Sequence, residues 1–160
     1  MRVLGIDSDS FRIVGVILND GVFEDSFLIE AGEKLAEDRF TFIGERFRVR
    51  ASVLKEKYKV DFVVIEESLY IQSPHATVTT TSVIAVIRYL LEQNKVKYKL
   101  LKNSSWKKLT FGTGKKTKEE TAAYVKTFGS FENRSQHFYD AYCIALAGTK
   151  LLEEKDGKLD

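Results

Sequence analysis

The spacing of hydrophobic positions changes several times along the chain, and each change predicts a different element. Two short apolar runs, Val3–Ile6 and Phe62–Ile65, are typical of central strands buried on both faces. The runs Phe11–Leu18 and Val22–Ile29 are separated by Asn19-Asp20-Gly21, a strong hairpin signal. The first thirty residues are therefore predicted to form three consecutive antiparallel strands.

Helical spacing follows the hairpin. Apolar residues that recur every three or four positions predict an amphipathic helix over about residues 36–58. They are Ala36, Phe40, Ile43, Phe47, Ala51, Leu54 and Tyr58. Ser73 followed by Pro74 is a good start for a second helix, which can run to about Asn94. The alternating segment Lys97–Leu101 predicts a further strand.

The C-terminal third reads as helical. We expect a short helix over Ser105–Thr110, and Thr117 with Glu120 forms a capping box for a helix that ends near Gly129. A last helix is expected after Ser135. The polar tail, residues 153–160, is expected to be disordered.

Composition adds limits to this picture. With 160 residues, 44% hydrophobic and 30% charged, residues 1–152 fit a single globular domain. No apolar run approaches the roughly 18 residues of a membrane span, and the N-terminus turns polar at once. The single cysteine, Cys143, fits a reducing compartment, so we expect a cytoplasmic protein. A net charge of +2 implies that any nucleic-acid surface comes from local clustering.

The order of elements predicts an α/β fold: an RNase H-like, mixed five-stranded sheet with helices on both faces. Such an arrangement places the first and fourth strands side by side. Asp7 ends the first strand and Glu66 ends the fourth, so both carboxylates are expected at one sheet edge.

The segment His137 to Gly148, HFYDAYCIALAG, places two more candidate ligands at the head of the last helix. His137 and Asp140 are three residues apart and therefore leave a helix from the same face. Three clustered carboxylates repel one another unless they are protonated or bind hard divalent cations. An oxygen-rich site of this kind suits Mg²⁺ or Mn²⁺, and two such ions can support phosphodiester hydrolysis.

Four segments resemble the signatures of RuvC-type Holliday junction resolvases, and they occur in that family's order. They are GID at 5–7, VVIEE at 63–67, WKKLTFGTGKKTKEE at 106–120 and HFYDAYCIALA at 137–147. The resemblance covers about residues 2–150. It implies a structure-selective endonuclease that cleaves four-way DNA junctions as a homodimer by paired nicks, with the dimer contact on the helix at about 74–93.

The resemblance also implies residue roles. The metal-binding catalytic residues would be Asp7, Glu66, His137 and Asp140, although many members carry Asp where His137 stands. The chain has Ser8-Asp9 where the family usually has Pro-Gly. The aromatic residue that the family uses to stack at the junction centre is replaced by Leu69, with Tyr70 beside it.

A basic segment completes the candidate DNA contacts, together with Leu69 and Tyr70. Its members are Lys107, Lys108, Gly112, Gly114, Lys115, Lys116 and Lys118. Its glycines would let the backbone approach a phosphate, and the segment leads into a helix N-terminus. Leu109 and Lys116 depart from a nucleotide-binding P-loop, so a kinase is disfavoured.

Each candidate also has an ordinary interpretation. Asp7 can be a turn former, His137 a partly buried histidine, and Asp140 a first-turn acid that favours the helix dipole. Two other functions stay open. One is a nuclease of the same fold with broader specificity for branched or single-stranded DNA. The other is a branched-DNA binding module that does not cleave.

Overall fold

The five-stranded sheet is the centre of the computed structural model, which describes residues 1–32, 36–67 and 73–156. The strands are β1 (Arg2–Ser8), β2 (Arg12–Asn19), β3 (Val22–Glu30), β4 (Phe62–Glu67) and β5 (Tyr98–Lys102), in the spatial order β3-β2-β1-β4-β5. The first three strands are antiparallel, and β4 and β5 lie parallel to β1. The predicted adjacency of the first and fourth strands is confirmed.

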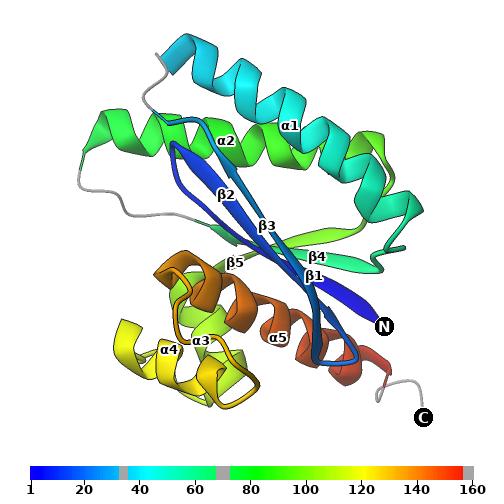
Figure 1. Cartoon of the computed structure of the whole chain (residues 1–160), viewed down its shortest axis with the longest axis vertical. Coiled ribbons are helices and arrows are strands. Elements are labelled where there is room, and N and C mark those ends of the chain that lie inside the picture. The colour runs from blue at the N-terminus through cyan, green and yellow to red at the C-terminus, as the bar shows by residue number, and fades with distance from the viewer. Residues whose placement is uncertain (33–35, 68–72, 157–160) are drawn as a thin grey trace.

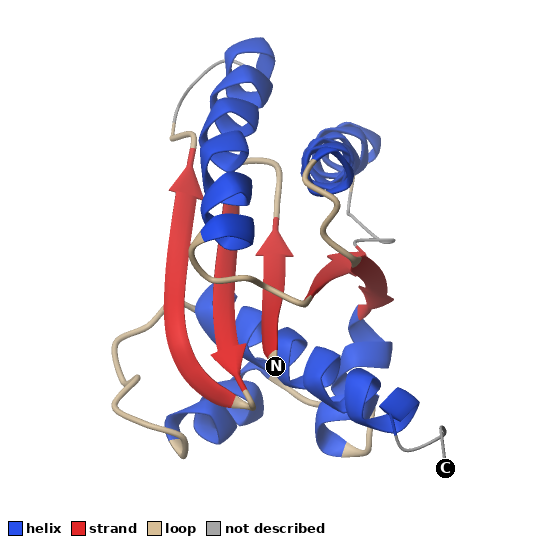
Figure 2. Cartoon of the chain, turned by 90° about the vertical axis from the view of Figure 1, so that its right-hand side faces the viewer, coloured by secondary structure: helices blue, strands red, loops and turns tan. Residues whose placement is uncertain are grey.

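Helices cover both faces of the sheet (Figure 1). Helices α1 (Ala36–Glu56) and α2 (Pro74–Gln93) pack on one face, and Figure 2 shows them on the side opposite to the three C-terminal helices. Those are α3 (Asn103–Phe111), α4 (Lys118–Lys126) and α5 (Gln136–Asp156), of which α5 lies across β1, β2 and β4. The predicted fold class, RNase H-like with helices on both faces, is confirmed.

Local signals in the sequence form the structures they predict. Asp20 and Gly21 both have positive φ, 49° and 78°, as a two-residue hairpin turn requires. Ser73 caps α2 by accepting a hydrogen bond from the backbone N–H of Ala76, with Pro74 at the first position. The capping box of Thr117 and Glu120 opens α4.

Three expectations about helix limits need correction. The short helix begins at Asn103, directly after β5, two residues before the expected Ser105. Helix α4 ends at Lys126, short of Gly129. Helix α5 continues to Asp156, into the segment expected to be disordered, while residues 157–160 lie outside the described part of the chain.

Helix α2 carries a stripe of six apolar residues between Val83 and Leu91, and this stripe is mostly core. Five of its six members are at most 8% exposed, and Val86 packs against the same cluster. The buried members are Val83, Ile84, Ile87, Leu90 and Leu91. A stripe that the sheet and α1 already cover does not require a partner chain, so a homodimer cannot be argued from it. In the described residues, no helix is both long and apolar enough to cross a membrane.

Helix α5 approaches β1 very closely, and small residues permit it. A Cβ at Gly5 would lie 2.2 Å from the carbonyl oxygen of Ala141 and 2.4 Å from the nitrogen of Ala145. One at Gly148 would lie 2.6 Å from Cγ1 of Val3. The helix backbone therefore rests directly on the strand that ends in Asp7.

Candidate active site

Asp7 and Glu66 meet at one edge of the sheet, as predicted. Ile6 pairs with Ile65 across the parallel β1–β4 ladder, so the next residues, Asp7 and Glu66, lie side by side. Both isoleucines belong to the core under α1 and α2, and side chains alternate between faces, so both carboxylates face α5. Alternation sends the neighbouring Glu67 to the other face.

The first turn of α5 brings the other two candidates to the same place. His137 Nδ1 lies 2.8 Å from Oδ2 of Asp7, across 130 residues of sequence. Asp140 interacts electrostatically with both Asp7 and Glu66. All four residues predicted as catalytic therefore converge, and we call them the acidic cluster: Asp7, Glu66, His137 and Asp140.

The acidic cluster carries more negative charge than its surroundings balance. Burial, followed by the charge of Asp7, raises the pKa of Glu66 from its ordinary value of 4.5 to about 7. Burial is also the main cause that raises the pKa of Asp140, with Asp7 adding to it. The hydrogen bond to Asp7 raises the pKa of His137 and so favours its imidazolium form. Without a bound cation, the protein thus favours the protonated forms of Glu66, Asp140 and His137.

Two amide side chains that the sequence analysis missed hold the carboxylates. Asn103, the first residue of α3, donates from Nδ2 to Oε1 of Glu66 at 2.9 Å. Gln136 donates from Nε2 to Oδ1 of Asp140 at 2.9 Å. Both bonds lower the pKa of the acid they reach and so favour its ionised form. Their signals were weak: Gln136 stands one helical turn before Asp140, and Asn103 follows the strand beside Glu66.

Asp9 and Trp106 are two further neighbours that sequence reasoning missed. Asp9 Oδ2 lies 3.8 Å from Nε2 of His137, so the imidazole stands between two aspartates. Asp9 itself is fixed, because its Oδ1 accepts from the backbone N–H groups of Phe11 and Arg12. The indole Nε1 of Trp106 is buried with no hydrogen-bond partner of ordinary geometry, yet it lies near enough to lower the pKa of Glu66.

The donor set fits a hard divalent cation. Three carboxylates and an imidazole suit Mg²⁺ or Mn²⁺, and the raised pKa values of Glu66 and Asp140 mark a place where added positive charge is favourable. Within the described residues, no three acidic, histidine or cysteine side chains yet surround a common point at ligand distance. Each of the three carboxylates has one contact with a protein side chain, namely His137, Asn103 or Gln136.

The basic segment is only partly free to contact DNA. Lys107 lies close enough to lower the pKa of Asp140, and its Nζ donates to the backbone carbonyl of Lys116 at 2.8 Å. Lys116 pairs with Glu120 at 3.1 Å. The remaining lysines of the segment, Lys108, Lys115 and Lys118, are exposed.

Local structure accounts for both glycines of this segment. Gly112 ends α3 with a φ of 78°, a conformation that favours glycine. A Cβ at Gly114 would lie 3.1 Å from the carbonyl oxygen of Ser104. The two remaining predicted contacts, Leu69 and Tyr70, lie outside the described residues.

The whole chain was compared with solved protein structures, and the similar structures include two of a RuvC protein. RuvC from Thermus thermophilus superimposes with a TM-score of 0.79 at 18% identity, covering 97% of both chains. The T. thermophilus RuvC in complex with Holliday junction substrate gives 0.80 at 16% identity, covering 96% of both chains. The chain has the fold of the RuvC-type Holliday junction resolvases.

The structure of a second resolvase is also similar to this chain. The yeast mitochondrial Holliday junction resolvase Ydc2 gives a TM-score of 0.65 at 13% identity, covering 97% of this chain and 80% of that one. No family model matches the sequence, and no curated protein matches it. At these identities the likeness establishes the fold, and the function must be argued from the site.

The burial of Glu66, together with charge repulsion in the acidic cluster, predicts an effect on the stability of the protein. Because the folded-state pKa of Glu66 lies above its unfolded value, the folded protein loses stability as pH rises from about 4.5 to about 7. Glu66→Gln removes that loss and keeps an acceptor for Asn103. We expect the metal-free variant to be more stable than wild type by about 1–3 kcal/mol at pH 8, with the difference vanishing near pH 4.5.

The measurement is urea unfolding in EDTA across this pH range. The matched control is Glu67→Gln, which changes a carboxylate on the opposite face of the same strand. A Glu66→Gln protein that gains no more than the control at pH 8 would show that the cluster is not under electrostatic strain.

Proposed function

We propose that the protein is a metal-dependent, structure-selective DNA endonuclease that resolves Holliday (four-way) junctions by paired nicks. The observation that carries the proposal is that Asp7, Glu66, His137 and Asp140 come together from three distant segments at one edge of the sheet in a RuvC-like fold. A pure binding module gains nothing from placing repelling carboxylates together in a partly buried site. Solved structures of this fold include complexes with Holliday junction DNA, which supports a branched-DNA substrate.

Asp7, Glu66 and Asp140 would hold one or two Mg²⁺ or Mn²⁺ ions, with His137 as a fourth ligand. Such ions, when bound, supply an activated water and neutralise the charge that develops on the leaving oxygen of a phosphodiester. The chain's own contribution is orientation. Asn103 and Gln136 fix the rotamers of Glu66 and Asp140 through hydrogen bonds of 2.9 Å. Preset carboxylates need less rearrangement when the substrate arrives.

His137 has two possible tasks in this proposal. In the metal-free protein it bonds Asp7, which favours the imidazolium form. An imidazole must be neutral to coordinate a metal, so cation and proton compete for it. In the metal-free protein, His137 orients the Asp7 carboxylate through the 2.8 Å contact between Nδ1 and Oδ2.

DNA would cross the surface beside the acidic cluster. Lys107 stands nearest to the cluster, and Lys108, Lys115 and Lys118 extend positive charge away from it. Lysines of this kind position a phosphate backbone without reading its sequence. Leu69 and Tyr70, which follow β4 in the sequence after Ser68, are proposed to contact the junction as well.

The main alternative is a nuclease of the same fold that cuts flaps, forks or single strands as readily as four-way junctions. The observation that favours it is the pair Ser8-Asp9, which replaces the family's usual Pro-Gly and places a fixed carboxylate beside His137. Comparing cleavage rates on a four-way junction, a fork, a flap and a linear duplex separates the two. A nuclease of broad substrate specificity would cut the fork and the flap at rates similar to its rate on the four-way junction.

We expect Asp7→Asn to fold and bind four-way junctions while cleaving them more than about a hundredfold more slowly, because the central ligand is lost. Initial nicking rates in Mg²⁺ and in Mn²⁺ measure this, with Asp38→Asn on α1 as the control at an exposed acid on the opposite face. Near wild-type cleavage by Asp7→Asn would refute the site. Junction binding without cleavage by the wild type in either metal would leave the binding module as the better reading.

Paired nicks need two active sites, and we propose a homodimer that uses α2. This proposal rests on the family resemblance and on the apolar side chains that remain exposed there, Val78 at 64% and Tyr89 at 61%. We expect light scattering to give a mass near twice the 18.3 kDa of one chain, reduced by Tyr89→Glu. A mass of one chain at every concentration tested would overturn it.

A further inference from the structure

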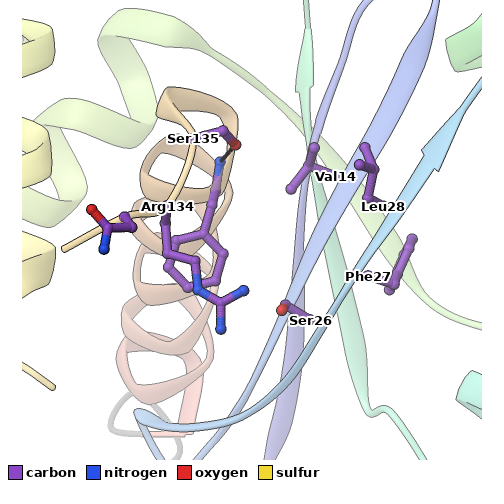
Figure 3. A pocket seen from close by; sticks show the side chains of 8 residues that line it. Val14, Ser26, Phe27, Leu28, Arg134 and Ser135 are labelled. Atoms are coloured by element: carbon purple, nitrogen blue, oxygen red, sulfur yellow. Dashed lines mark hydrogen bonds between the residues drawn. The ribbon is translucent and has the colours of Figure 1, made fainter. Parts of the chain in front are cut away.

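A pocket of about 340 Å³ lies between strands β2 and β3 and the start of α5. One wall is formed by Val14 of β2 and by Ser26, Phe27 and Leu28 of β3. The other is formed by the segment Asn133–Ser135 and by Phe138 at the start of α5 (Figure 3). The pocket takes no part in the metal-binding arrangement described above.

Backbone pairing ties this pocket to the acidic cluster. Asp7 pairs with Val14 on the neighbouring strand, and Val14 pairs with Leu28 on the strand beyond it. Paired residues share a face of the sheet, so Leu28 lies on the face of Asp7, two strand spacings or roughly 10 Å away. On the opposite wall, Ser135 and Phe138 flank His137 in sequence.

The chemistry of the walls combines an apolar surface with a cation. Leu28 lines the pocket and is 59% exposed, so it offers an apolar surface to a ligand. The guanidinium carbon of Arg134 stands 5.0 Å from the centre of the Phe138 ring. Arg134 is exposed and forms no ion pair with any carboxylate in the part of the chain that the structure describes, so its charge is available to a ligand.

Those features match one unit of a DNA strand. A nucleotide offers a sugar and a base for apolar or stacking contact and a phosphate for a guanidinium. The N-terminus of α5, which begins at Gln136, adds a favourable field for that phosphate. A phosphate alone would not use Leu28, and an apolar ligand would not use Arg134.

We infer that this pocket binds one nucleotide of the cut strand next to the scissile phosphate. Its sugar or base rests on Val14 and Leu28, and its phosphate contacts Arg134. The inference rests on the proposed function, because the scissile phosphate is assigned to the acidic cluster. It gives the enzyme a contact that sets which phosphodiester of a strand is presented for cleavage.

Two pairs of matched variants test the inference. Leu28→Glu puts a negative charge into the pocket, and Val49→Glu puts the same charge on α1 at an equally exposed site, 58% against 59%. Arg134→Ala removes the pocket's cation, and Arg48→Ala removes an exposed arginine of α1. The probes are a fluorescent four-way junction and the same junction with an abasic residue on either side of the cleaved bond.

We expect Leu28→Glu and Arg134→Ala to lower the cleavage rate about tenfold or more. The control variants Val49→Glu and Arg48→Ala should cleave at near the wild-type rate. Arg134→Ala should also reduce the salt dependence of junction binding by about one phosphate contact. An abasic residue on one side of the cleaved bond should slow wild type and have little further effect on Leu28→Glu.

The outcomes separate this inference from the function beneath it. If wild type cleaves junctions and both pocket variants behave as their controls, the pocket assignment is wrong and the proposed function stands. If wild type cleaves no DNA, the pocket assignment and the proposed function are both wrong. Should Leu28→Glu unfold at a lower temperature than Val49→Glu, Arg134→Ala with the abasic junctions decides the matter.

Discussion

The whole site depends on the contact between α5 and β1. At Gly5 the strand has no side chain, and the backbone of the helix at Ala141 and Ala145 occupies the space where a Cβ would stand. Any other residue at position 5 would force the helix away from the strand, since the nearest atoms are backbone and cannot rotate aside. The first turn of α5 would then carry His137 and Asp140 away from Asp7. Small residues deep in the core therefore determine the distances in the active site.

That contact creates an electrostatic conflict that the rest of the site manages. Three carboxylates share one partly buried place, and the pKa values of Glu66 and Asp140 rise as a result. Asn103, Gln136 and His137 each donate to one carboxylate and offset part of the repulsion. The negative charge that remains favours the binding of a positive ion. In the metal-free protein, that ion is a proton, and we propose that a divalent cation can take its place. In our proposal, the stability that is lost in the metal-free protein keeps negative charge available for a divalent cation.

Much of the fold follows from local signals in the sequence. The hairpin turn at Asp20-Gly21, the cap at Ser73 and the capping box at Thr117 act within a few residues, and all form as predicted. The acidic cluster was predictable because Asp7 and Glu66 each end a buried strand and His137 and Asp140 share a helix face. Their functional roles remain predictions, since the comparisons establish only the fold.

What the sequence could not provide depends on long-range geometry. Asn103 reaches Glu66 only because β5 lies beside β4, and an exposed asparagine after a strand carries no sign of that. How much of the apolar stripe on α2 the sheet and α1 cover depends on packing that periodicity does not encode. The same holds for the pocket at Leu28, whose walls come from segments a hundred residues apart.

The central claim is that the acidic cluster is a divalent-cation site, and the most direct measurement is anomalous diffraction from crystals soaked in Mn²⁺. The account predicts manganese peaks bounded by Asp7, Glu66 and Asp140, with the bond between His137 and Asp7 replaced by metal coordination. Saturating Mn²⁺ that leaves no peak at these carboxylates, with the 2.8 Å contact between His137 and Asp7 intact, would contradict it.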